Sequence, residues 1–306
     1  MNTRLVFTLT SLAFGLAAAA CGGGGSSTPP DAPMKDIGFN KPTGSLKANN
    51  EVSADNWVEI GPADLSCIGT PAADPATTVG VTLSAVVRDF QSDNLVPNTN
   101  VVVFKDQDQS MVFDTKQADG NAAVTLTLPV GTKRFGYKMT SDSALDTLLL
   151  NQKVEPDMEM QNAGVIKSVS KTTAQTLPAL IGVSRTVGTG VLAGAFRDCQ
   201  DNEISNFIAT VSTTSGTVNH AAGADTYYFS PTVGLPVRHS QQAAGSKNGL
   251  FMIIELQPAT SAYVQVWGYK TDADVAADNL ELVAELQTAV VAETVITGAY
   301  EPLRTQ

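Results

Sequence analysis

Two stretches of the chain share one pattern, Arg88-Asp89-Phe90-Gln91-Ser92-Asp93-Asn94 and Arg197-Asp198-Cys199-Gln200-Asp201-Asn202. An apolar run precedes each stretch, and a second one, 101–104 or 207–211, follows it. Asp and Asn tolerate left-handed backbone and hydrogen-bond within their own turn, so each stretch predicts a tight reversal between two strands. A match of this length at a long period indicates a duplicated domain.

The residues around these turns predict an all-β protein. Charged residues make up 16% of the chain, and segments such as 81–87 alternate apolar with polar or small residues. Short alternating strands with regular turn signals are typical of antiparallel sandwiches. We therefore predict two tandem Ig-like β-sandwiches, at residues 57–183 and 186–306. Residues 281–296 are also predicted as strands because their Val, Ile and Thr residues favour extended chain.

A short helix is predicted between the two sandwiches, over residues 170–177. Ser170 is a suitable N-cap, because its hydroxyl can accept a hydrogen bond from the first turn. Pro178 and Gly182 follow and are predicted to end the helix.

The N-terminus has the order of a secretion signal. Arg4 precedes Leu5–Ala20, an uncharged run too short to span a bilayer. The small residues before Cys21 resemble the lipobox of bacterial lipoproteins, in which the cysteine carries the lipid. Residues 1–20 are thus predicted to be a signal peptide, and residues 21–56 a lipid anchor with a disordered, Gly/Ser/Pro-rich linker. The alternative is an ordinary cleavage site beside an accidental cysteine.

These features predict an exported protein that is held on a membrane by its N-terminal lipid. Gly22 stands after the cysteine where Asp would signal retention, so resemblance to Gram-negative lipoproteins implies the outer membrane, on either its periplasmic or its surface face. The formal net charge of -11 repels phosphate backbones and argues against a nucleic-acid partner.

Cys67 and Cys199 form an even pair once Cys21 is assigned to lipid. An exported context favours a disulfide between them, which would join the lead-in of the first sandwich to the first turn of the second. The alternative is two buried free thiols. A metal site is not expected, because no histidine or further cysteine lies at ligand spacing from either residue.

The turn and strand positions together resemble the carboxypeptidase regulatory-like domains of the transthyretin-like (prealbumin-like) sandwich. In the first copy the resemblance rests on Asp89, Asp93-Asn94, Pro97-Asn98, Asp119-Gly120, Leu128-Pro129-Val130-Gly131 and Gly136-Tyr137. In the second copy it rests on Asp198, Asp201-Asn202, Asn206, Asn248-Gly249, Leu256-Gln257-Pro258 and Gly268-Tyr269. Asn replaces the usual Gly of the first turn in both copies, and the second copy lacks Leu-Pro-x-Gly. The resemblance implies a fold and a non-catalytic module.

The sequence predicts no enzyme and no cofactor. His220 and His239 are the two histidines, and neither lies beside a nucleophile-elbow sequence. Intradiol dioxygenases share a similar sandwich and hold iron with Tyr and His, but the His-x-His pair that their site resembles is missing here. A metal-dependent enzyme using residues 213–246 is therefore a remote alternative.

Residues 213–246 are predicted to be an insertion in the second copy, because its Gly-Tyr-Lys triplet lies farther from the Asp-Asn turn than in the first copy. The insertion gathers aromatic and donor groups that would suit an interface, namely Tyr227, Tyr228, Phe229, Arg238 and His239. The alternative is a long hairpin whose aromatic residues complete the core.

Two functions follow from this sequence. The first is a cell-envelope lipoprotein whose tandem sandwiches bind a surface polymer, such as a glycan or the cell wall, or a protein partner. The second is a structural spacer without a ligand.

The lipid anchor makes the first testable prediction. Radiolabelled palmitate should enter the wild-type chain in its bacterial host and should not enter a Cys21→Ala variant, because the thiol is the attachment point. Cys199→Ser is the matched control and should label as the wild type does. Equal labelling of Cys21→Ala, or no labelling of the wild type, would contradict the anchor.

Overall fold

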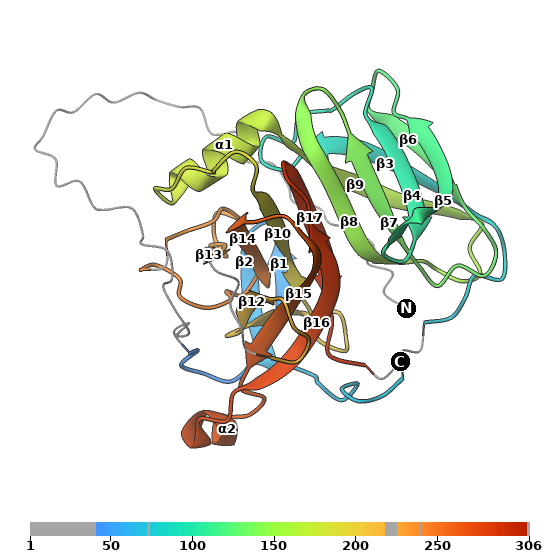
Figure 1. Ribbon diagram of the computed structural model, residues 1–306. Coiled ribbons are helices and arrows are strands. Elements are labelled where there is room, and N and C mark those ends of the chain that lie inside the picture. Colours follow the sequence, from blue (N-terminus) through green and yellow to red (C-terminus); the bar gives the residue numbers. More distant parts are fainter. Residues whose placement is uncertain (1–40, 72–73, 218–224, 239, 305–306) are drawn as a thin grey trace, which may run out of the picture.

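The computed structural model describes residues 41–71, 74–217, 225–238 and 240–304. The chain is mostly β and forms two sandwich units that lie side by side (Figure 1). This confirms the predicted fold class. The predicted signal peptide, Cys21, His220 and His239 lie outside the described residues.

The first unit is formed by seven strands. They are β3 (Val81–Asp89), β4 (Asn100–Lys105), β5 (Asp108–Gln117), β6 (Ala123–Leu128), β7 (Arg134–Thr140), β8 (Ala144–Lys153) and β9 (Met160–Ser170). In one sheet β3 pairs antiparallel with β6 and parallel with β9, and the facing sheet runs β5-β4-β7-β8. Alternating residues of both sheets, such as Leu83, Val103, Leu126 and Tyr137, fill the core between them.

The second unit repeats this connectivity. Its strands are β10 (Gly190–Phe196), β11 (Glu203–Ser205), β12 (Ile208–Ser212), β13 (Asp225–Tyr228), β14 (Leu250–Leu256), β15 (Ala259–Gly268), β16 (Glu281–Val290) and β17 (Thr294–Tyr300). β10 pairs antiparallel with β14 and parallel with β17, as β3 does with β6 and β9. The facing sheet runs β12-β15-β16, as β4-β7-β8 does. The two halves therefore share one strand order, as a duplicated domain requires.

One strand changes place between the copies. β5 pairs with β4 in the first unit, whereas β13 crosses to the other sheet and pairs with β14. β13 lies inside the predicted insertion, and all four of its residues are buried. The insertion therefore contributes part of the core of the second unit.

The two repeated Asp-Asn turns have left-handed backbone at equivalent positions. Asp93 (φ 57°) and Asp201 (φ 64°) are left-handed, and so are Asn98 (φ 59°) and Asn206 (φ 66°) before the next strand. Asp and Asn adopt this conformation at low cost, which explains why they stand at these positions.

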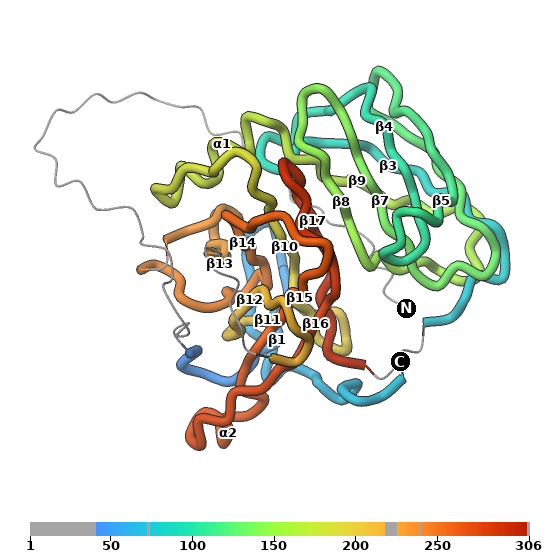
Figure 2. The backbone as a smooth tube through the Cα atoms, in the orientation of Figure 1, coloured from blue at the N-terminus to red at the C-terminus, as the bar shows by residue number. Residues whose placement is uncertain are grey.

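The N-terminal hairpin belongs to the second unit. β1 (Lys47–Ser53) pairs with β2 (Asn56–Pro62) and with β11, and Leu46 is buried in the second core. Figure 2 shows β1 beside β11, far from the strands of the first unit. The prediction that residues up to 56 are a linker, and that the first domain begins at residue 57, is therefore wrong. The N-terminal hairpin belongs to the second unit, the strands that follow it form the first unit, and the strands after the first unit complete the second.

A continuous sheet joins the two units. β17 pairs in parallel with β8, so the β13-β14-β10-β17 strands continue into β8-β7-β4-β5. The paired residues run without a register shift from Thr294 opposite Asp146 to Gly298 opposite Leu150. Because backbone hydrogen bonds cross the joint, the two units are linked by more than a peptide connection.

The predicted helix is present as α1 (Lys171–Leu180). Ser170 is its N-cap and accepts a hydrogen bond from the Thr173 amide, as predicted. Pro178 does not end the helix, which continues to Leu180. The helix ends instead at Ile181 and Gly182, whose amides bond back to Pro178 and Ala179. A second helix, α2 (Asp272–Ala277), is a single capped turn before β16.

Candidate functional site

The described residues hold no obvious reaction centre, so the candidate site is the region where the two repeated turns meet other parts of the chain. In the first turn, Asp89 is buried and its carboxylate accepts hydrogen bonds from the backbone amides of Ser92 and Ser170, at 2.9 and 2.7 Å. The Thr173 hydroxyl donates to it as well, at 2.8 Å. Asp89 thereby holds both its own turn and the beginning of α1.

These donors decide the ionisation of Asp89. Burial alone would raise the pKa of its carboxyl, but the amides of Ser92 and Ser170 and the hydroxyl of Thr173 together hold the pKa below its usual value of 3.8. The charged form is therefore the one that the folded chain stabilises.

In the second turn, Asp198 also accepts hydrogen bonds from its own turn and from a second segment, but that segment is a different one. It accepts hydrogen bonds from the amides of Gln200 and Asn202, both at 2.9 Å, within its own turn. It also accepts one from the Asp64 amide at 3.1 Å, on the segment that follows β2. The first turn therefore holds the connection that follows its unit, and the second holds the connection that arrives from the N-terminal hairpin.

The next residue of each turn reinforces this difference. Phe90 packs edge-on against Phe229 of the second unit, with ring centroids 6.2 Å apart. Cys199 takes the equivalent place and forms a disulfide with Cys67, with 5.9 Å between the Cα atoms. The predicted disulfide is thus confirmed, although it ties the N-terminal hairpin into the second unit instead of joining two separate units. A bond of this kind typically stabilises a fold by about 2–4 kcal/mol.

The Gln of each turn follows the same division. The Thr176 hydroxyl of α1 donates to Gln91, at 2.8 Å. Gln200 donates to the Asp64 carboxylate, at 3.0 Å. In the second copy, Asp198, Cys199 and Gln200 therefore all contact the segment from Asp64 to Cys67. In the first copy, Asp89 and Gln91 contact α1 and its N-cap, whereas Phe90 contacts Phe229 of the second unit.

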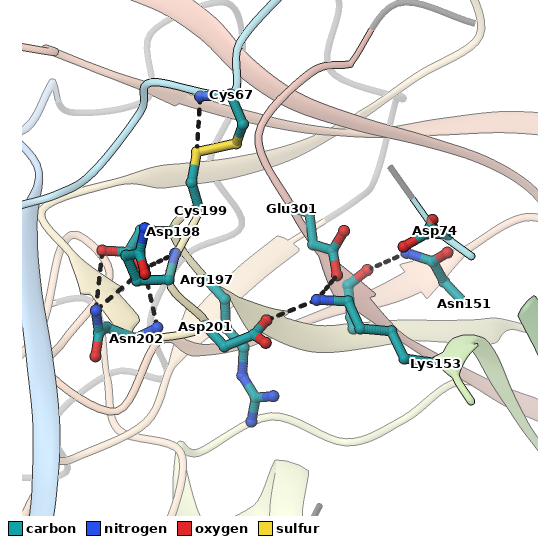
Figure 3. A network of polar contacts seen from close by, with 12 residues as sticks. Cys67, Asp74, Asn151, Lys153, Arg197, Asp198, Cys199, Asp201, Asn202 and Glu301 are labelled. Carbon is teal, nitrogen blue, oxygen red and sulfur yellow. Dashed lines mark hydrogen bonds and ion pairs between the residues drawn. A yellow bond between two sulfur atoms is a disulfide. The ribbon is translucent and has the colours of Figure 1, made fainter. Parts of the chain in front are cut away.

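Charged side chains close the joint beside the second turn. Arg134 of β7 binds Asp74 at 2.9 Å and Glu301 at 3.0 Å, and Lys153 of β8 binds Glu301 at 2.9 Å and Asp201 at 2.8 Å. Figure 3 shows Asp201 reaching Lys153, Asp198 bonded to Asn202 of its own turn, and Cys199 bonded to Cys67 of the N-terminal segment. Burial alone would raise the pKa of Glu301, but Arg134 and Lys153 lower it below its usual value.

This ion-pair network was not predicted from the sequence. Arg134 and Glu301 lie far apart in the chain, and neither belongs to a motif. Their side chains are each 13% exposed, so the pair is shielded from solvent more than a surface ion pair is. The Asp201–Lys153 pair is about half exposed and contributes less.

The aromatic residues predicted as exposed anchors lie in the interior. Tyr227, Tyr228 and Phe229 are 0%, 3% and 4% exposed. The Tyr227 hydroxyl donates to Asp225, and the Tyr228 hydroxyl accepts from the Ala209 amide at 3.1 Å. This burial agrees with the alternative that they complete the core, and their contact with a ligand stays a prediction. Phe229 packs with Tyr227 and Met252 of its own unit and also contacts Phe90 of the other unit.

Arg238 does not join these aromatic residues in an exposed cluster. It is half-buried in the loop after β13, where its carbonyl accepts hydrogen bonds from the amides of Gln241 and Gln242. His239 lies outside the described residues, so the predicted five-residue surface is not assembled from the residues that are described.

Two further features bear on function. Within residues 41–71, 74–217, 225–238 and 240–304, no three His, Cys, Asp or Glu side chains are grouped to hold a metal ion. In the same part of the chain, no helix has the length and apolar character needed to span a bilayer.

Comparison with known proteins gives no family assignment. No family model matches the chain, and no curated protein matches it. The resemblance to carboxypeptidase regulatory-like domains therefore stays a prediction.

Solved structures with partial similarity include a Bacillus anthracis protein and two pilins. The Bacillus anthracis TIE protein is 11% identical with a TM-score of 0.25, and the match covers 73% of this chain and 34% of that one. The shaft pilin SpaA from Lactobacillus rhamnosus GG is 11% identical with a TM-score of 0.21, covering 75% of this chain and 100% of that one. GBS52, the minor pilin of Streptococcus agalactiae, is 10% identical with a TM-score of 0.21, covering 74% and 98%. This chain thus spans about a third of the TIE protein, and similarity at this level carries no functional argument.

The buried turn carboxylate makes a testable prediction. Asp89→Asn should lower the free energy of unfolding at pH 7 by about 1–3 kcal/mol, because hydrogen bonds to a charged acceptor are replaced by weaker ones. The pKa of Asp89 is lower in the folded chain than its usual value of 3.8. Its contribution is therefore complete above that value and is lost as the pH falls through the folded pKa. Urea unfolding of wild type and variant should differ less at about pH 3 than at pH 7.

The control for this experiment is Asp142→Asn, at an exposed aspartate. It should change the free energy of unfolding by less than about 0.5 kcal/mol at either pH. An Asp89→Asn effect no larger than the control, or one that grows toward acid, would contradict the assignment.

Proposed function

We propose that the protein is a non-catalytic, exported lipoprotein that acts as a rigid two-unit scaffold, tethered to the outer membrane through Cys21. The observation that carries this proposal is the continuous sheet across the joint, in which β17 of the second unit pairs with β8 of the first. Domains in one chain usually move relative to each other unless their interface is extensive and apolar. Here the strand pair is reinforced by Phe90 and by the ion pairs of Arg134 and Lys153.

Two other observations support the proposal. The Cys67–Cys199 bond suits an exported protein, because disulfides persist in oxidising compartments. Tyr227, Tyr228 and Phe229, which were predicted to bind a ligand, lie in the core and at the joint. Their position favours a scaffold over ligand recognition by the 213–246 insertion. The partner that binds this scaffold would be a glycan or an envelope protein.

The rigidity of the joint is tested by a distance measurement. Spin labels on Lys116→Cys in β5 and Gln287→Cys in β16, both exposed positions, report the separation of the two units by pulsed electron resonance. Labelling is done without reductant so that the native disulfide stays intact. The proposal predicts one narrow distance distribution.

A variant of the joint provides the comparison. Phe90→Ala removes the ring that packs on Phe229 and should broaden the distribution. Leu95→Ala, at an exposed leucine near the same turn, should leave it narrow. A broad distribution in the protein with native Phe90 would contradict the rigid scaffold.

A further inference from the structure

β2 is a strand whose side chains are mostly exposed and whose outer edge lies at the end of a sheet. It ends the three-stranded β11-β1-β2 sheet, and none of its seven residues is buried. Within the described part of the chain, no strand pairs with its outer edge. An edge of this kind presents unpaired backbone amides and carbonyls to any extended chain that can lie beside it.

The hairpin also exposes aliphatic side chains. Val58 lies opposite Asn50 in the regular part of the hairpin, and Val52 and Ile60 lie at its two register shifts. Val52 is 57% exposed, Val58 44% and Ile60 55%. Such β-branched residues normally pack against a neighbouring layer.

Another edge strand of the protein carries a feature that discourages pairing, whereas much of β2 does not. β9 is an edge only before Val169, because β8 pairs with its last two residues, and in this free part it has a register shift near Ala163, followed by the left-handed Gly164 (φ 66°). Bulges of this kind bend an edge away from incoming strands. In β2 the irregularity lies at Ile60, so Asn56–Glu59 remains a regular edge.

Charge indicates what could occupy this edge. Residues 48–62 contain Glu51, Asp55 and Glu59 and no Lys or Arg. A second copy would bring the same three carboxylates against them, and like charges across a strand pair are destabilising. A strand in which aliphatic and basic residues alternate would satisfy both the exposed aliphatic side chains and the carboxylates.

We propose that β2 is a docking edge for an extended segment of another protein, in which aliphatic and basic residues alternate. The segment would add a fourth strand to β11-β1-β2, with its backbone bonded to Asn56–Glu59 and its aliphatic residues against Val58 and Ile60. This surface is what the proposed scaffold would present to a partner, so the inference rests on that function.

The test uses the full-length chain purified in detergent and a synthetic nonapeptide of alternating lysine and valine. Binding is followed by fluorescence anisotropy, and the binding edge by hydrogen exchange of the β2 amides. We expect saturable binding that weakens as salt is added, with slowed exchange at residues 56–59. The same peptide with glutamate in place of lysine, or with alternate amides methylated, should bind at least about tenfold more weakly.

Two variants locate the site. Val58→Lys with Ile60→Lys should weaken binding at least about tenfold, because it removes the aliphatic contacts and offsets two of the three nearby negative charges. Val130→Lys with Val187→Lys makes the same change at exposed valines elsewhere and should bind the peptide as the wild type does. Both double variants are checked for an unchanged melting temperature.

Three results would overturn the proposal. One is no binding of the lysine peptide, equal binding of the lysine and glutamate peptides, or equal binding to both double variants. Another is concentration-dependent dimerisation that the β2 variant abolishes, which would make a second copy the occupant. The third is slow exchange of the β2 amides in the free protein that becomes fast when residues 22–40 are removed, which would make the chain's own N-terminal segment the occupant.

The docking proposal and the scaffold proposal fail separately. If the peptide does not bind, the docking proposal is wrong, but the spin-label test of the rigid scaffold is unaffected.

Discussion

A buried aspartate in each repeated turn organises the rest of the structure. Asp89 and Asp198 are both almost fully buried, and a carboxylate in such a place must be surrounded by donors. Each finds some of them in its own turn and the remainder on a segment that enters from outside, Ser170 and Thr173 in one case and Asp64 in the other. The requirement to satisfy these buried carboxylates therefore fixes how the connecting segments run. Beside Asp198, Cys199 adds a disulfide to the same segment, and beside Asp89, Phe90 adds an aromatic contact with the second unit.

Duplication explains why the same turn serves two purposes. The ancestral strand order persists in both units, but the position after the aspartate has diverged into Phe90 in one copy and Cys199 in the other. The phenylalanine suits a joint between units, where it meets Phe229, whereas the cysteine fastens the segment whose Ala63, Leu65 and Ile68 pack against the second core. The strand pair of β8 and β17 then makes the joint part of a sheet, and the N-terminal hairpin is left with one strand, β2, that contacts little besides β1.

Features carried by local patterns could be predicted from the sequence. The duplicated turns, the cap at Ser170 and the strands of residues 281–296 each depend on neighbouring residues, and all are present. The Cys67–Cys199 bond was the one long-range contact that the sequence predicted, because only two cysteines remained to pair. Long-range strand pairing could not be predicted, because a parallel pair such as β8 with β17 has no local signature. β1 was missed because Lys-Ala-Asn-Asn lacks an alternating apolar pattern and its pairing partner lies far along the chain. The aromatic cluster was misplaced for a related reason, since composition alone does not tell an exposed tyrosine from a buried one.

The central claim is that the shared sheet, the Phe90–Phe229 contact and the ion pairs of Arg134 and Lys153 make two sandwiches behave as one body. Differential scanning calorimetry of the oxidised full-length protein tests it most directly, because independent units melt independently. The account predicts a single transition in which the calorimetric enthalpy of unfolding equals the van't Hoff enthalpy. Two resolved transitions, or a calorimetric enthalpy about twice the van't Hoff value, would show that the two sandwiches unfold separately and would contradict the account.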